Sequence, residues 1–297
     1  MRAIGRRYIT IGIVTGVLAL SACGSESKRS QSDNTVDSVT LTNRGSDTIV
    51  NLALAWAEAY HIVYPNVSIS VTGGGSGTGI AAMINGTVDI ANASRKMKDK
   101  EISNAKDNGF VPLEYAIARD GIAVIVHPQN PVNRLTLQQL SDIFSGKVTN
   151  WIDVGGEDRP IVCLSREVNS GTHVYFLETV VRMGNKKDET FFAPSTLLLP
   201  SSEGIISEVS HNPNAIGYDG LGYVTEAVKT IAVAPDYTSP YISPTIENVI
   251  NNSYPISRSL YMYVSGEPTG YTKDYIDWIY SSEAQLIVKE LGFVPVN

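Results

Sequence analysis

The sequence predicts an α/β fold arranged as two lobes. Short β-rich runs alternate with segments of helical pattern along most of the chain, which is the order of an α/β sheet. The 297 residues are enough for one large domain or two ordinary ones. A second series of alternating runs follows the β-rich run at 122–126. Two lobes are the packing that we expect for so many units.

The N-terminal segment has the layout of a secretory signal. Three arginines precede an apolar run over residues 9–20, and this run is shorter than the roughly 18 apolar residues of a membrane-spanning helix. The tetrad that ends at Cys23 resembles a lipobox, whose cysteine is diacylated. We therefore predict a signal peptide over residues 1–22, export, and a palmitate-bearing lipid anchor at Cys23. The alternative is an ordinary cleaved signal with an incidental cysteine.

The segment that follows the signal reads as a tether. Residues 23–38 are polar, rich in Ser and Asp and without periodicity, so we expect a flexible linker and a fold that begins at Val39. A lipidated Cys23 would leave Cys163 without a disulfide partner, so the core must hold the fold.

The charge balance narrows the possible partners. The 30 acidic residues outnumber the 23 basic ones, which argues against a protein that coats nucleic acid. A small anionic ligand remains possible, because such an ion is bound by local donors and not by the global field.

The first set of alternating units comprises five segments. They are β-rich runs at 39–41, 67–71 and 88–91, with helical patterns at about 47–61 and 78–85 between them. The chain closes with a strand at 260–264 and one helix from about 271 to 291. The apolar face of this helix would carry Tyr275, Trp278, Ile279 and Leu286.

The second lobe is predicted from the segments that lie between these two groups. They are strands at 122–126, 161–164 and 215–218, with helices at about 137–144, 172–182 and 203–211.

Three strand-to-helix connections share a Gly/Ser/Thr composition. They lie at 45–48, 73–79 and 169–172. The first N–H groups of a helix have no intrahelical partner and carry partial positive charge, so each connection could bind an oxyanion. Taken singly, each is also explained by helix capping, for which Ser, Thr and Asp are preferred. Arg166, four residues before Ser170, favours the anion site because a guanidinium donates two hydrogen bonds to an oxyanion.

Several catalytic patterns are not met. No Gly-Lys-Ser/Thr follows the glycine run, and Thr78 occupies the last position of a would-be Gly-x-Ser-x-Gly. The four histidines are scattered without metal-ligand spacing. Ser170 and His173 could form a catalytic pair, but this spacing at a helix start is common by chance. We therefore expect no enzyme, no cofactor and no metal.

Five motifs in order carry a resemblance to a known family. They are Gly-Ser-Asp-Thr at 45–48, the glycine run, Val-Asp-Ile-Ala-Asn-Ala-Ser-Arg at 88–95, Arg166 with 170–172, and Ala-Ile-Gly-Tyr at 215–218. Together they resemble the phosphate-binding protein of the high-affinity phosphate ABC transporter. The resemblance implies a type II periplasmic-binding-protein fold, in which a ligand cleft separates two lobes, each a mixed sheet flanked by helices. It implies one lobe over 39–117 plus 257–297 and another over 118–256.

The resemblance also implies the ligand-binding residues. The predicted phosphate site comprises Ser46, Asp47, Thr48, Ser76, Gly77, Arg95, Arg166, Ser170, Gly171 and Thr172.

Two of these positions depart from the family pattern. Asp47 stands where an enterobacterial member has Thr, and Arg95 stands where the family has an Asp that accepts the phosphate proton. Our hypothesis is that Asp47 takes over as acceptor, while Arg95 balances its charge or binds the ion. The alternative is an N-cap at Asp47 and a surface residue at Arg95.

The sequence therefore predicts a monomeric, extracytoplasmic protein that captures inorganic phosphate and delivers it to the permease of an ABC transporter. The predicted partners are phosphate, the permease subunits, and a membrane through the anchor, with no nucleic acid. A binder of sulfate or molybdate on the same fold is the first alternative. A secreted phosphatase or hydrolase, or a lipoprotein acting only in adhesion or signalling, belongs to another class.

Overall fold

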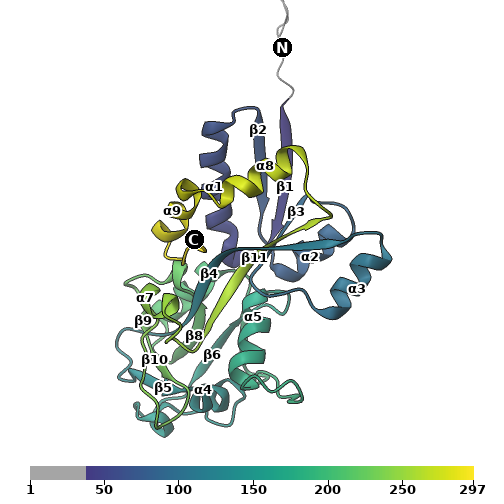
Figure 1. Cartoon of the computed structure of the whole chain (residues 1–297). Helices are drawn as coiled ribbons and strands as arrows, with labels where there is room; N and C mark the ends of the chain where they lie inside the picture. Colours follow the sequence, from purple (N-terminus) through teal and green to yellow (C-terminus); the bar gives the residue numbers. More distant parts are fainter. Residues whose placement is uncertain (1–37) are drawn as a thin grey trace, which may run out of the picture. The chain divides into compact units, whose positions relative to one another are not determined.

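One hydrogen-bonded sheet runs through residues 38–297, which are the residues that the computed structural model describes (Figure 1). Its strands follow the order β2 (Val67–Thr72), β1 (Val39–Gly45), β3 (Ile90–Ala93), β11 (Ser257–Ser265), β4 (Pro112–Val126), β8 (Ala215–Gly220), β6 (Val162–Arg166) and β7 (Leu197–Leu199). A short strand, β9 (Lys229–Thr230), also pairs with β4, and β10 (Ala232–Ala234) pairs with β5 (Arg134–Thr136). The predicted signal peptide, Cys23 and most of the predicted tether lie outside the described residues.

The pairing directions show how the two lobes are joined. Strand β1 is parallel to β2 and β3, and β6 is parallel to β8 and β7. Strand β11 runs antiparallel to both β3 and β4, and β4 runs antiparallel to β8. The long pair of β4 and β11 therefore links the two groups of parallel strands, as Figure 1 shows. The predicted two-lobed α/β fold is confirmed.

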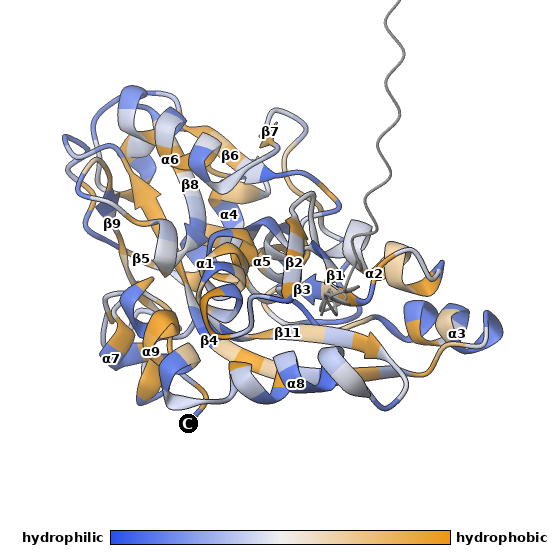
Figure 2. Cartoon of the chain, turned by 90° about the horizontal axis from the view of Figure 1, so that it is seen from above, coloured by the Kyte–Doolittle hydropathy of each residue, from blue (hydrophilic) through white to orange (hydrophobic). Residues whose placement is uncertain are grey.

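The helices before β4 follow the predicted pattern. Helix α1 (Asp47–Val63) buries Ile49, Leu52, Trp56 and Tyr60 at helical spacing. Helix α2 (Ser76–Ile84) begins two residues earlier than expected. Helix α3 (Asp99–Asp107) was not predicted, because it buries only Ala105 and contains few apolar residues. Figure 2 shows α3 as largely hydrophilic.

Three of the four helices between β4 and β11 lie at the expected positions. The four are α4 (Leu137–Phe144), α5 (Gly171–Phe176), α6 (Ser202–His211) and α7 (Ile246–Ile250), of which α7 was not predicted. Helix α5 continues directly into a π-helical turn, η2 (Leu177–Val181), and two 3₁₀ turns lie at Trp151–Val154 (η1) and Leu221–Tyr223 (η3). Thr136 begins α4 with a capping box, in which its hydroxyl accepts from Gln139 N at 3.1 Å.

The predicted single C-terminal helix is wrong. The chain forms α8 (Gly270–Ile279) and α9 (Ser282–Glu290) instead. Ser281 starts the second helix, because its hydroxyl accepts a hydrogen bond from Ala284 N at 3.2 Å. The break changes which residues face the core, so Tyr275, Trp278 and Ile279 are buried while Leu286 is 54 % exposed.

Strands β4 and β11 are both longer than predicted. The sequence indicated residues 122–126 and 260–264, whereas the strands begin at Pro112 and Ser257. Each added segment contains charged residues, which interrupt the apolar pattern. These extensions place Asp120 and Arg258 inside paired strands.

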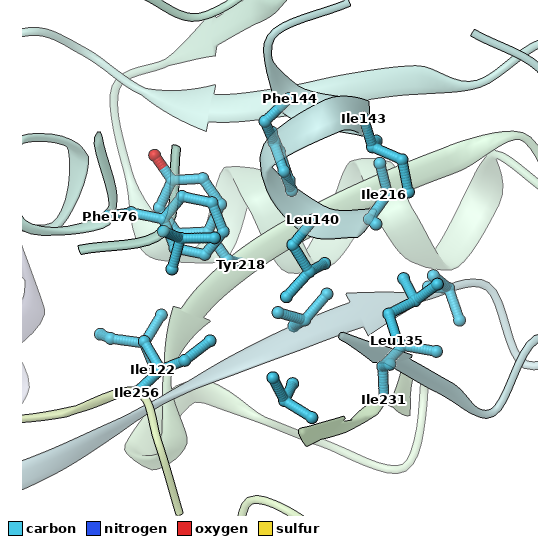
Figure 3. Close-up of a cluster of buried hydrophobic side chains, with 14 of the residues drawn as sticks. Ile122, Leu135, Leu140, Ile143, Phe144, Phe176, Ile216, Tyr218, Ile231 and Ile256 are labelled. Atoms are coloured by element: carbon cyan, nitrogen blue, oxygen red, sulfur yellow. The ribbon is translucent and has the colours of Figure 1, made fainter. Parts of the chain in front are cut away.

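The apolar cores follow the two lobes. The cluster around Trp56 and Tyr60 takes its residues from before residue 119 and after residue 259. The cluster around Phe144 and Phe176 lies between residues 122 and 256, except for Val294. Figure 3 shows Phe176 stacked on Tyr218, with ring centroids 3.6 Å apart. Each lobe therefore has its own core.

Residues 38–297 contain neither a membrane-spanning helix nor a cluster of metal ligands. None of the helices in 38–297 is long and apolar enough to cross a membrane. Within the same residues, no three His, Cys, Asp or Glu side chains are grouped as metal ligands.

Candidate functional site

The three glycine- and hydroxyl-rich connections predicted from the sequence lie together at the starts of α1, α2 and α5. Thr48 Oγ1, at the start of α1, lies 2.7 Å from Thr172 Oγ1, at the start of α5. Gly77 N, at the start of α2, donates to Asn169 O at 3.0 Å. Thr48, Ser76 and Thr172 are each at most 1 % exposed. Hydroxyls from both lobes therefore meet in a buried place.

Gly171, the first residue of α5, lies close to the hydroxyls of the opposite lobe. A Cβ atom at this position would lie 2.3 Å from Ser76 Oγ and 2.5 Å from Ser94 Oγ, so a side chain would collide with both hydroxyls. Ser94 directly follows β3, and its backbone N donates to Ser76 Oγ at 3.0 Å. The requirement for glycine thus follows from the contact between α5 and the hydroxyls of the opposite lobe.

Ser170 caps α5. Its hydroxyl oxygen accepts from Thr172 N at 3.2 Å and from His173 N at 3.4 Å. His173 Nδ1 lies 2.9 Å from Arg166 O, to which it donates in the matching tautomer, and its pKa is lowered mainly by burial. The Ser170 hydroxyl therefore serves as a helix cap, while the His173 ring contacts Arg166 O and, at 3.0 Å, the hydroxyl of Ser165. By contrast, Ser46, 2 % exposed, forms no side-chain cap on α1.

Arg166 is held between two carboxylates at the lobe interface. Its Nη2 lies 2.9 Å from Asp47 Oδ2, and its Nη1 lies 3.8 Å from Asp219 Oδ2. Nη1 also donates to Ser202 Oγ at 2.7 Å, and Nη2 donates to Pro200 O at 2.8 Å. The guanidinium is 1 % exposed, and its Nε has no hydrogen-bond partner among the described residues.

Asp47 is bound at the start of α6. Its Oδ2 accepts from Ser202 N at 3.0 Å in addition to its contact with Arg166. A carboxylate from one lobe therefore occupies a helix N-terminus and a guanidinium of the other, which is the pairing expected for an anion. Nearby, burial raises the pKa of Asp219 to about 6, against the opposing effect of Arg166.

Arg95 is paired within its own lobe. Its Nη1 and Nη2 donate to the two oxygens of Glu101 at 2.8 and 2.7 Å. The cation bound to Asp47 is Arg166 and not Arg95, which was one of the two roles expected for Arg95. Arg95 is nevertheless only 8 % exposed, and its Nη2 lies 3.9 Å from the position of a Cβ on Gly77. It borders the predicted site and is not a surface residue.

A second buried ion pair joins the two linking strands. Asp120, on β4, accepts from Arg258, on β11, with Oδ2 3.0 Å from Nη2. Arg258 also donates to Thr172 Oγ1 and to Ser94 O, each at 2.9 Å. Burial raises the pKa of Asp120, while Arg258 opposes this shift. Arg258 thus connects the linking strands to hydroxyl-bearing residues of both lobes.

Comparison with known proteins places this arrangement in a family. A family model described as a PBP superfamily domain matches residues 28–283. The chain belongs to the PBP superfamily. It is 34 % identical to the phosphate-binding protein PstS of Pseudomonas aeruginosa, over 86 % of this chain and 83 % of the relative. It is 31 % identical to PstS of Bacillus subtilis, over 95 % and 91 % of the two chains.

A solved structure agrees with these relatives. A putative phosphate ABC transporter substrate-binding protein from Clostridium perfringens, solved with bound phosphate, has a TM-score of 0.77 and 38 % identity. The match covers 87 % of this chain and all of that one. The resemblance drawn from the sequence motifs is confirmed.

Sequence analysis of this PBP superfamily member missed Ser94, Asp120 and Arg258. Ser94 was part of a recognised motif, but its neighbour Arg95 was chosen as the ligand. Asp120 and Arg258 precede the predicted strands at 122–126 and 260–264, and they are 138 positions apart in the sequence. Had the strands been predicted at their full length, a charged residue inside a buried strand would have been the signal for each.

Proposed function

We propose that this PBP superfamily protein captures inorganic phosphate outside the cytoplasm and passes it to the permease of an ABC transporter. The observation that carries the proposal is the buried meeting of three helix starts from two lobes, at Thr48, Ser76 and Thr172. The P. aeruginosa and B. subtilis relatives are named as phosphate-binding proteins, and the C. perfringens structure contains phosphate. We propose binding and release, without bond cleavage.

The proposed phosphate donors are the groups at these helix starts. The hydroxyls of Ser46, Thr48, Ser76, Ser170 and Thr172 and the backbone N–H of Gly171 would surround one tetrahedral ion. The N–H of Gly77, which donates to Asn169 O in the structure, would exchange that acceptor for the ion. Arg258 donates to Thr172 Oγ1, so the hydroxyl hydrogen of Thr172 is left to donate elsewhere. Either hydroxyl can donate in the Thr48–Thr172 hydrogen bond, and a phosphate oxygen would accept from both hydroxyls in its place.

The two arginines and Asp47 would complete the site. Arg166 has a free buried Nε–H among the described contacts, and Arg95 has another. Asp47 Oδ2 is occupied by Arg166 and Ser202 N, whereas its Oδ1 accepts no protein hydrogen bond within 38–297. We propose that Oδ1 accepts the proton of hydrogen phosphate. Sulfate has no such proton at neutral pH, so this contact would favour phosphate.

The lobes are proposed to span 39–117 plus 257–297 and 118–256. The separate apolar cores support these bounds, and β4 and β11 provide the connections. Bending of these strands would open and close the cleft, and closure would exclude water and strengthen each polar contact.

Export, the lipid anchor at Cys23 and a monomeric state are further parts of the proposal. The sequence of the N-terminal segment supports the first two. The permease subunits are proposed as partners because the C. perfringens relative is named as a substrate-binding protein of a phosphate ABC transporter.

Isothermal titration of the purified protein with phosphate, followed by competition with sulfate and molybdate, tests the function. We expect one phosphate per chain, not displaced by an equal concentration of sulfate. Absence of phosphate binding would refute the proposal. Tighter binding of sulfate or molybdate would assign the protein to another oxyanion.

A further inference from the structure

The segment that follows α9 contacts both lobes, although it is not one of the two linking strands. It leaves the helix through Gly292, whose φ of 80° is left-handed. Phe293 is 2 % exposed and packs in the core of the lobe that contains α1. Val294, the next residue, is 3 % exposed and packs in the core of the lobe that contains α5. Two consecutive side chains therefore enter the apolar cores of different lobes.

The backbone of this segment pairs with β4 where that strand passes from one lobe to the other. Arg119 N donates to Val294 O at 2.8 Å, and Val294 N donates to Arg119 O at 2.9 Å. Farther along the same edge, β4 pairs with β8, with Ile122 opposite Gly220. The other edge of β4 is occupied by β11, with Ser259 opposite Arg119. The segment and β8 thus follow each other along one edge of β4, and Figure 1 shows the end of the chain beside this strand.

A further contact joins the segment to η3, which belongs to the lobe of α5. A Cβ atom at Gly222 would lie 2.7 Å from Leu291 O and 2.7 Å from the ring of Phe293. A Cβ atom at Gly292 would in turn lie 3.2 Å from the Cα atom of Gly222. The segment therefore packs directly against the backbone of η3, and a side chain at Gly222 would force the two apart.

The segment is fixed to the lobe of α1 on both sides of Val294. Before it, Phe293 lies in the core of that lobe. After it, Val296 N donates to Gln285 Oε1 at 3.0 Å. Gln285 is 4 % exposed, and its Nε2 donates to Ile117 O at 3.1 Å. Because both flanks stay with the lobe of α1, separation of the lobes would loosen the packing of Val294 in the opposite core.

We propose that residues 291–294 form a strap across the hinge, which stabilises the closed arrangement of the lobes through Val294. The effect of the strap on phosphate affinity rests on the proposed function, whereas its effect on lobe opening does not. A ligand that binds only the closed protein loses apparent affinity in proportion to the closed fraction. A weakened strap should therefore open the ligand-free protein and weaken phosphate binding.

The test compares Val294→Ala with the control Val233→Ala in the purified protein. Both changes remove two methyl groups from the same apolar core, but Val233 lies on β10, which pairs with β5 inside one lobe. Titration with inorganic phosphate should give Val294→Ala an affinity roughly three- to tenfold lower than that of the control, because these buried carbons hold the lobes together. Small-angle X-ray scattering of the ligand-free proteins should show a larger radius of gyration for Val294→Ala than for the control.

Gly222→Ala tests the strap from the side of η3. The added Cβ atom would collide with Leu291 O and with the ring of Phe293, so we expect the same two changes as in Val294→Ala. Equal phosphate affinity and equal radius of gyration in Val294→Ala and Val233→Ala would refute the strap and leave the phosphate site intact. The scattering comparison needs no ligand, so it would still decide the strap if the wild type bound no phosphate, a result that would refute the proposed function.

Discussion

Arg166 and Arg95 were predicted for the same role, and the structure gives them different surroundings. Arg166 is buried between lobes, with carboxylates of Asp47 and Asp219 on two sides and one free Nε. Arg95 makes a two-point contact with Glu101, six residues away and 22 % exposed. The charge of Arg95 is balanced by a carboxylate of its own lobe, whereas Arg166 takes one of its carboxylates, Asp47, from the other lobe and should therefore respond to closure. Each arginine keeps an Nε without a partner among the described residues. The predictions below test this difference.

Replacing Arg166 should have the largest effect. Arg166→Met leaves the buried carboxylate of Asp219 and the partly buried one of Asp47 without their cation, so we expect a loss of unfolding free energy of about 3–5 kcal/mol. Phosphate affinity should fall by roughly ten- to hundredfold, because one charge-assisted hydrogen bond contributes about 1.5–3 kcal/mol. Chemical denaturation and titration measure the two effects. Unchanged affinity in folded protein would remove Arg166 from the site.

The Asp120–Arg258 pair extends the comparison to a third arginine. Arg258 is buried like Arg166, but it has one carboxylate partner instead of two. Arg258→Met should destabilise the protein by about 3 kcal/mol, since Asp120 is left charged and buried. The double variant Asp120→Asn/Arg258→Met should recover much of this loss. It should still bind phosphate more weakly than the wild type, because Thr172 loses its donor. Wild-type affinity in the double variant would contradict the link to Thr172.

Asp47→Asn tests whether the carboxylate that Arg166 contacts across the lobe interface also selects phosphate over sulfate. The amide can donate as well as accept, so the proton on phosphate is no longer favoured. We expect the preference for phosphate over sulfate to shrink by about tenfold, equivalent to about 1.4 kcal/mol. Competition titration measures the ratio, with Asp89→Asn as a control whose carboxylate binds Thr42 instead. An unchanged ratio would leave Asp47 as a structural partner of Arg166 alone.

Arg95→Gln should have the smallest effect on stability, about 1 kcal/mol, because the pair with Glu101 is partly exposed. Burial would raise the pKa of Glu101, but the hydrogen bonds from Arg95 and from Lys98 N lower it overall. The pair therefore stabilises the fold above the ordinary pKa of Glu, and this contribution is lost as pH falls through the lowered value. The gap in Tm between wild type and variant should be widest at neutral pH. A gap that widens on acidification would contradict this account.

The sequence was sufficient for the features that depend on local patterns. Alternating β-rich and helical segments predicted the two-lobed α/β fold, and Gly/Ser/Thr-rich connections predicted the three helix starts that meet. It was insufficient where the partner lies far along the chain. Asp120 and Arg258 are 138 positions apart, and Arg166 finds Asp47 across the lobe interface. The break at Ser281 was missed because apolar spacing continued through a residue that caps a new helix.

A crystal structure of the protein with bound phosphate tests the central claim most directly. The account predicts one phosphate ion within hydrogen-bond distance, about 3.2 Å or less, of hydroxyls at Thr48, Ser76 and Thr172. In the same structure, Arg166 would contact both the ion and Asp47. A phosphate ion seated elsewhere, with the Thr48–Thr172 hydrogen bond intact, would contradict the account.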